Sequence, residues 1–147
     1  MNTKQYDKLA DDLKPDKNIF GNCVRAFLYG GAIGAIGQGL LEFYMYIYDC
    51  SQKEAIPMMT LTIVLVAVIL TGLGLYDKIA RKAGAGTFIP ITGFANSMAS
   101  SAIEGRSEGL VTGIGPGMFK LGGTVIMFGI VASFILGGIR YVIEYFG

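Results

Sequence analysis

The sequence predicts an all-α integral membrane protein with three long transmembrane helices and a broken segment between the second and the last. Of the 147 residues, 52% are hydrophobic and only 16% are charged, a balance typical of membrane proteins. Three apolar runs are each long enough to cross a bilayer, which takes about 20 helical residues. Between the last two lies a stretch, 83–117, that is too apolar for a surface loop and too rich in Gly and Pro for a spanning helix.

The first 20 positions form a polar tail of mixed charge. The tail has no apolar core of the kind found in signal peptides, so we expect the first spanning helix to drive insertion. We therefore divide the chain into a polar cytoplasmic tail, 1–20, and a single polytopic membrane domain, 21–147. A net charge of +1 without a basic run argues against nucleic-acid binding.

The reactive residue types are scarce, because the chain has two cysteines and no histidine. This excludes the Ser-His-Asp and Cys-His triads and the His-rich zinc sites. Cys23 and Cys50 flank the first apolar run, and that length of helix rises about 40 Å, too far for a disulfide within one chain. We expect a protein that is not an enzyme and that has no cofactor and no metal.

The first apolar run, 22–48, begins at Asn22, a residue type that caps helices, and ends in a cluster of aromatic residues typical of the membrane interface. Gly31, Gly34, Gln38 and Glu42 fall on one face. The small residues allow another helix to approach closely, and the polar ones are costly against lipid. This face is either a packing seam or part of a polar path, and both interpretations stay open.

The second apolar run, 56–76, has Pro57 in its first turn and an uninterrupted apolar centre, which indicates a structural, lipid-facing helix. Three basic residues follow it, and the tail before the first run is also rich in Lys, whereas the loop between the two runs holds only Lys53. The positive-inside rule therefore places the N-terminus in the cytoplasm.

The broken stretch begins with Gly84, Gly86 and Pro90, which interrupt a regular helix and predict an unwound segment over 84–91. Thr92 can then cap a helix over 93–104, whose twelve residues rise about 18 Å, roughly half a bilayer. We expect this half-helix to re-enter the membrane. The alternative is an amphipathic helix on the membrane surface, but such helices carry Lys or Arg on the polar face.

One face of the predicted half-helix is polar, and its N-terminus offers unpaired N–H groups to an anion. Irregular backbone is tolerated at membrane depth only where it is buried in protein or lines a water-filled cavity. We therefore predict that the polar face lines a pore, with two residues of the first run behind it. The candidate residues are Thr92, Asn96, Ser97, Ser100, Glu104, Gln38 and Glu42.

A second break is predicted around Pro116, and the last apolar run, 118–138, follows it. The segment superficially resembles a phosphate loop, but Leu121 stands where that motif needs Ser or Thr after the lysine. The Gly and Pro residues of both breaks are either gating hinges or only the permissive backbone that a re-entrant turn requires. These candidates are Gly84, Gly86, Pro90, Gly93, Gly115, Pro116 and Gly117.

Several unusual sequence blocks occur in an order that resembles the SpoVAC/SpoVAEB family of sporulation membrane proteins, and the resemblance runs from about Gly21 to the C-terminus. The blocks are G-N-C-V-R-A-F-L-Y-G-G-A-I (21–33), G-A-G-T-F-I-P-I-T-G-F-A-N-S-M (84–98), S-E-G-L-V-T-G (107–113) and M-F-K-L-G-G (118–123). The polar tail and the N-C-V-R-A-F start of the first run favour the AC branch over the AEB branch.

The resemblance implies a subunit of the SpoVA complex in the inner membrane of bacterial spores. That complex moves dipicolinic acid, with calcium, into the forespore and releases it at germination. The AC branch is implied to form a channel that responds to membrane tension. The implied partners are other SpoVA proteins, especially an AEB-type paralogue and a soluble SpoVAD-type subunit, in an oligomer with dipicolinate as the transported solute.

Two other functions are weighed against a channel. A non-conducting scaffold subunit of the same complex would anchor soluble partners to the membrane. A proton-coupled exporter needs an ionisable residue near the middle of the membrane, and Glu42, the only candidate, lies toward one end of its helix. The charge distribution does not settle whether the broken stretch re-enters, which would put the C-terminus outside, or crosses the membrane.

Overall fold

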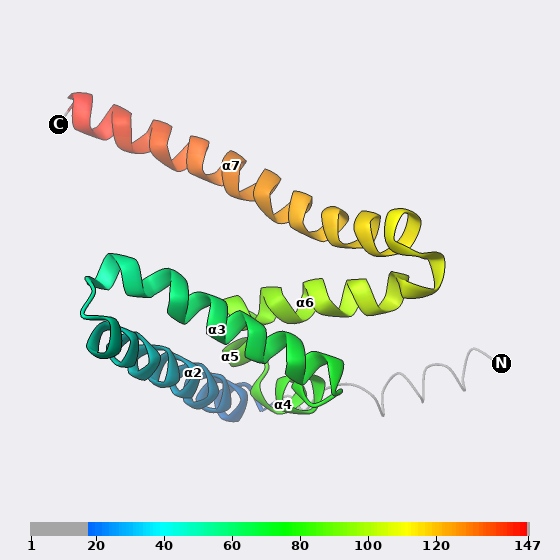
Figure 1. Ribbon diagram of the computed structural model, residues 1–147. Coiled ribbons are helices and arrows are strands. Elements are labelled where there is room, and N and C mark those ends of the chain that lie inside the picture. The colour runs from blue at the N-terminus through cyan, green and yellow to red at the C-terminus, as the bar shows by residue number, and fades with distance from the viewer. Residues whose placement is uncertain (1–17, 147) are drawn as a thin grey trace.

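The computed structural model describes residues 18–146, which form a chain of helices (Figure 1). Three of these helices are long and apolar enough to cross a membrane, counting the π-turn before the last one as part of it. This confirms the predicted all-α fold class; residues 1–17 of the predicted tail lie outside the described part. The helices are α2 (Ile19–Tyr48), α3 (Gln52–Gly72), α4 (Tyr76–Ala83), α5 (Ala85–Phe88), α6 (Ile91–Glu104) and α7 (Gly115–Phe146), with a 3-10 turn η1 (Gly105–Glu108) and a π-turn η2 (Leu110–Ile114) before α7.

The first two helices begin earlier than the sequence predicted. Helix α2 is capped by Asn18, whose side chain accepts a hydrogen bond from the Gly21 N–H at 3.0 Å, so the predicted cap at Asn22 is wrong. Helix α3 is preceded by Ser51, whose N–H and hydroxyl both donate to the Glu54 carboxylate, at 2.9 and 2.8 Å. Pro57 consequently lies in the second turn rather than the first. The helix ends at Gly72, before Gly74 with its φ of +67°.

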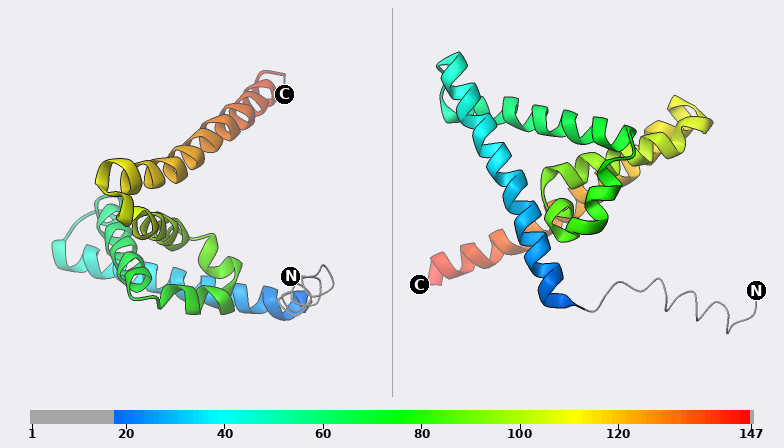
Figure 2. Two further views of the ribbon diagram at one scale, coloured as in Figure 1. Left: turned by 90° about the vertical axis from the view of Figure 1, so that its right-hand side faces the viewer. Right: turned by 90° about the horizontal axis from the view of Figure 1, so that it is seen from below.

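Helices α2 and α3 meet near their connection and spread apart along their length (Figure 2). At the narrow end the Tyr44 hydroxyl lies 2.7 Å from that of Thr62. At the wide end α4, α5 and the start of α6 fill the space between the two helices. A small core of Ala67, Tyr76 and Ala95 joins α3, α4 and α6 there.

The first break is only partly as predicted, because its middle is helical. Gly84 interrupts the chain with a φ of +53°, but Ala85–Phe88 then forms one helical turn beside α2, so the prediction of an unwound segment over 84–91 is wrong for these residues. Pro90 adopts an extended conformation immediately before α6, and Thr92, predicted as the cap, lies within the first turn. Helix α6 ends at Glu104, as predicted. Its 14 residues rise about 21 Å, which is too short to cross the roughly 30 Å hydrocarbon core of a bilayer.

The second break lies earlier in the chain than predicted, at residues 105–114. Gly109 has a φ of +89° between η1 and η2, and Gly105 packs against Gly113, where a Cβ added to Gly105 would lie 2.6 Å from the Gly113 carbonyl carbon. Pro116 is instead in the first turn of α7, where its missing N–H costs no helical hydrogen bond. The predicted break at Pro116 is therefore wrong.

The path of the chain reverses between α5 and α7. Helix α6 runs from the middle of the molecule toward the end at which α3 finishes, and α7 then runs back toward the end that holds the α2–α3 connection (Figure 1). Helix α7 contacts α6 and η2 but leaves all its residues at least partly exposed. The re-entry of the broken segment into the membrane stays a prediction.

Candidate functional site

The polar side chains of α6 point toward two different helices, α3 and α7. The Thr71 hydroxyl of α3 lies 2.8 Å from Oδ1 of Asn96, which ties α6 to α3. The Ser97 hydroxyl donates to the Gly93 carbonyl of its own helix at 3.0 Å. Asn96 is therefore an interhelical link in this chain, whereas the serines and Glu104 turn toward α7.

A groove of about 640 Å³ runs between α6 and α7. It is floored by Gly117, where an added Cβ would lie 2.7 Å from the Ser101 hydroxyl oxygen, so the missing side chain lets the two helices approach. Three of the predicted pore-lining residues, Ser97, Ser100 and Glu104, share this groove. It is lined by Ser97, Ser100, Ser101, Glu104, Gly117, Lys120, Leu121, Thr124 and Val125.

The groove offers hydrogen-bond donors that nothing else in the described chain uses. Neither Ser100 nor Ser101 has a side-chain partner among residues 18–146, and within the same range the Lys120 ammonium forms no ion pair. Thr124, by contrast, donates to the Lys120 carbonyl at 2.6 Å. A hydroxyl donates one hydrogen bond and an ammonium three, so the groove suits a small carboxylate-bearing solute.

Lys120 is the functional candidate that the sequence reasoning missed. It entered that reasoning only through the failed phosphate-loop comparison, although it lies one turn before Thr124 and is the single charged residue of 115–139. A charged residue inside a membrane segment marks a functional site or needs a partner. That signal, a Lys and a Thr four residues apart, was available in the sequence.

Gln38 and Glu42 do not join the polar face of α6. The Gln38 amide donates to the Glu42 carboxylate at 2.9 Å, and both side chains are exposed on α2. They line neither the groove beside α7 nor the cavity at the centre of the fold. The predicted grouping of these two residues behind the half-helix is not formed within one chain.

Thr92 lies on the opposite side of α6 from the groove. Its side chain is buried, its hydroxyl has no hydrogen-bond partner among the described residues, and it borders the cavity between α2 and α3. The described residues also contain no group of three or more His, Cys, Asp or Glu side chains placed to hold a metal ion.

Two of the three predicted hinge glycines of the first break, Gly86 and Gly93, are tightly packed. A Cβ on Gly86 would clash with the Ala26 carbonyl and lie 2.9 Å from the Gly30 nitrogen, and one on Gly93 would lie 2.7 Å from the Thr87 carbonyl oxygen. Gly84 has open space around it and a positive φ. Gly86 and Gly93 are thus required by close backbone contact, whatever movement they also permit.

Comparison with known proteins identifies the family. The model of the SpoVAC/SpoVAEB sporulation membrane proteins matches residues 22–139, which include every helix from α2 to most of α7. The chain belongs to this family. It is similar to the stage V sporulation protein AC of Bacillus subtilis (strain 168), with 49% identity over 141 residues, 96% of this chain and 94% of that protein. No solved structure matches.

Family membership makes this chain an integral membrane protein of sporulation, with a role in the SpoVA system. The similarity to the AC protein covers nearly the whole length of both chains. The groove between α6 and α7 lies within the part that the family model matches.

Proposed function

We propose that this chain is a channel-forming subunit of the SpoVA system and that the groove between α6 and α7 forms part of the path for dipicolinate. The observation that carries the proposal is the pair of hydroxyls, Ser100 and Ser101, that have no partner among the described residues and face the same groove as Lys120. Polar side chains of this kind within a membrane segment mark solute pathways.

The chemistry of the groove fits dipicolinate, a small planar dianion. The hydroxyls can donate to its carboxylates and Lys120 supplies one positive charge, while Glu104 at the same groove limits the net attraction for an anion. Conduction requires binding that is favourable enough for entry and weak enough for release. Glu104 also provides a carboxylate that can accompany calcium, a cation that prefers oxygen ligands.

One chain supplies only part of a pore, because α7 projects beyond its contacts with α6 and η2 and none of its described residues is buried. The exposed Gln38–Glu42 pair is a second polar surface that would be costly against lipid. Both features support assembly with further SpoVA subunits, an AEB-type paralogue and a soluble SpoVAD-type subunit among them, in the spore inner membrane. Basic residues of α4 near the end of α3 support an N-terminus on the core side.

The test replaces groove residues in spores and measures dipicolinate content and its release at germination. Lys120→Gln and the double variant Ser100→Ala, Ser101→Ala should each lower accumulation and slow release several-fold, at normal levels of the protein. The matched control is Ser133→Ala on the exposed part of α7, outside the groove. Unchanged accumulation and release in both groove variants would refute the assignment.

The rival scaffold function is separated by reconstitution. Purified complex containing this chain should release dipicolinate from liposomes, and the Lys120→Gln complex should release it more slowly. If this chain is only a scaffold, the two complexes should have equal fluxes, because Lys120→Gln leaves the subunits that conduct the solute unchanged.

A further inference from the structure

A second cavity, of about 240 Å³, lies between α2 and α3 on the far side of the molecule's centre from the groove. Its walls are mostly apolar side chains of three helices, among them Ile36 of α2, Val66 of α3 and Ile79 of α4. Thr87 of α5 and Thr92 of α6 complete the lining. The cavity exists because α2 and α3 spread apart while α4 and α5 occupy only the wide end (Figure 2). The Thr92 hydroxyl is the lining group left without a hydrogen-bond partner among the described residues, so most of the lining suits an apolar ligand rather than a polar solute.

The cavity opens onto the surface that the two spanning helices present to the bilayer. Ile36 is 61% exposed and Val66 is 49% exposed, and both belong to helices long and apolar enough to cross a membrane. The material next to that opening is therefore lipid hydrocarbon. Apolar cavities of about 150 Å³ already bind molecules the size of benzene, so this cavity can hold a stretch of acyl chain.

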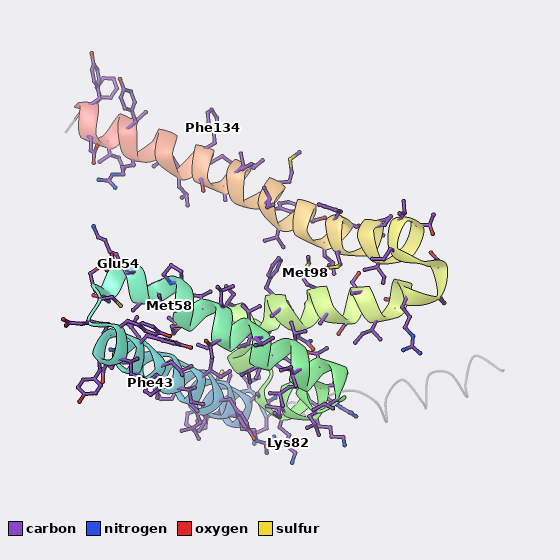
Figure 3. The ribbon with its side chains drawn as sticks, in the orientation of Figure 1. Phe43, Glu54, Met58, Lys82, Met98 and Phe134 are labelled. Carbon is purple, nitrogen blue, oxygen red and sulfur yellow. The ribbon has the colours of Figure 1, made fainter. Side chains whose placement is uncertain are left out.

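Helix α4 closes one end of the cavity and has two contrasting faces. Tyr76 and Ile79 border the cavity, and the Tyr76 hydroxyl is held by a 2.9 Å hydrogen bond to the Thr87 carbonyl. Lys78, Arg81 and Lys82 are exposed on the same short helix, and Lys82 lies on the side of α4 away from α3 (Figure 3). Asp77 is the only acidic residue of α4.

We propose that this surface binds one anionic phospholipid, with an acyl chain in the cavity and the phosphate group at Lys78, Arg81 and Lys82. Basic residues next to a spanning helix attract anionic headgroups, and an amphipathic helix places its apolar face at the level of the acyl chains. The cavity supplies what a basic cluster alone lacks, a defined position for the chain of one lipid. The proposal concerns a site separate from the groove and does not depend on the proposed function.

The test is native mass spectrometry of the full chain in detergent with phosphatidylglycerol or phosphatidylcholine added. The wild-type chain should retain one phosphatidylglycerol several-fold more often than one phosphatidylcholine. Val66→Phe fills the cavity from α3 and should lower retention of both lipids several-fold. Val131→Phe, at a comparably exposed position of α7, should not.

The headgroup contact is tested by the triple variant Lys78→Gln, Arg81→Gln, Lys82→Gln. It should retain the two lipids equally, whereas a control triple at Lys53, Arg106 and Arg140 should keep the preference for phosphatidylglycerol. Ile36→Phe fills the cavity from α2 and repeats the cavity test if Val66→Phe does not fold. Wild-type retention in a folded cavity variant, an unchanged preference in the α4 triple variant, or no retained lipid in the wild-type chain would each overturn the proposal.

Discussion

Glycine has different surroundings in the two halves of this molecule. In the half that runs from α2 to α6, some glycines lie at backbone contacts between helices: Gly86 packs on Gly30, and Gly93 packs on the carbonyl groups of α5, whereas Gly31, Gly34 and Gly39 of α2 have open space. In α7, a Cβ added to Gly123, Gly129, Gly137 or Gly138 would meet nothing within 4 Å.

The difference indicates that one chain completes the helix–helix contacts of α2 to α6 but not those of α7. In lipid, helices associate through close contact of small residues and interhelical hydrogen bonds, because apolar burial gives no advantage over hydrocarbon. The α2–α6 half makes these contacts within itself, including the Thr71–Asn96 pair. From Gly123 onward, the glycines of α7 have no neighbour in the described chain, so we expect the neighbour of this part of the helix to come from another subunit.

The largest effect on stability should come from Gly86→Ala, which disrupts the contact between α5 and α2. The new methyl group would clash with the Ala26 carbonyl of α2, which is backbone and cannot move aside. We expect a loss of about 1–3 kcal/mol in the free energy of unfolding, measured by denaturation in mixed micelles. Gly34→Ala on the same helix as Ala26 has open space around it and is the matched control; equal losses in both variants would contradict the comparison.

The next largest effect concerns α7. Gly137→Leu with Gly138→Leu should cause no loss of unfolding free energy in the isolated chain, because a side chain at either position starts in open space. The same variant should reduce co-purification with other SpoVA subunits roughly tenfold, equivalent to about 1.4 kcal/mol. Replacement of Leu136, exposed on the same helix, by Ala serves as a control for changes of surface shape. Full co-purification of the double leucine variant would show that this face of α7 is lipid-facing.

A smaller effect is expected from the link between α3 and α6. A double-mutant cycle of Thr71→Val and Asn96→Leu should give a coupling energy of about 0.6 kcal/mol, the average for such bonds in membrane helices. The measurement is the same micelle denaturation. A coupling energy of zero would mean that Asn96 is free to serve the solute path, as the sequence alone suggested.

The smallest effect should come from the C-terminal turn of α7. Arg140 and Glu144 form an exposed ion pair at 2.8 Å, one turn apart on the helix. Exposed pairs of this kind contribute about 0.3–0.5 kcal/mol, so Arg140→Gln should change the unfolding free energy by no more than that. A loss comparable to that of Gly86→Ala would place this end of α7 in the packed α2–α6 half.

The sequence was sufficient to predict the three long helices and their order, because hydrophobic run length reports directly on membrane spans; it did not predict the short helices α4 and α5. It was not sufficient for the starts of the long helices. Asn18 and Asn22 have the same capping chemistry one turn apart, and only the Gly21 contact distinguishes them. Pro116 resembled a break because proline also begins helices. The actual break is shaped by the contact between Gly105 and Gly113, two residues of the same loop whose approach no local sequence pattern indicates.

The candidate site was also predictable only in part. The period of the helix places Ser97, Ser100 and Glu104 together without any knowledge of their neighbours. Which neighbour each side chain meets is a tertiary property, and so the Asn96 contact with Thr71 and the position of Lys120 across the groove required the structure. The separation of Gln38 and Glu42 from α6 has the same origin.

The most direct test of the solute path is thiol modification of a single groove position while flux is measured. In a complex whose chain carries Cys23→Ala and Cys50→Ala, Ser100→Cys should react with a small charged thiol reagent, and dipicolinate flux in vesicles should fall several-fold on modification. Ser133→Cys, on the exposed part of α7, should leave the flux unchanged whether or not it reacts. Complete modification of the Ser100→Cys variant with undiminished flux would contradict the account.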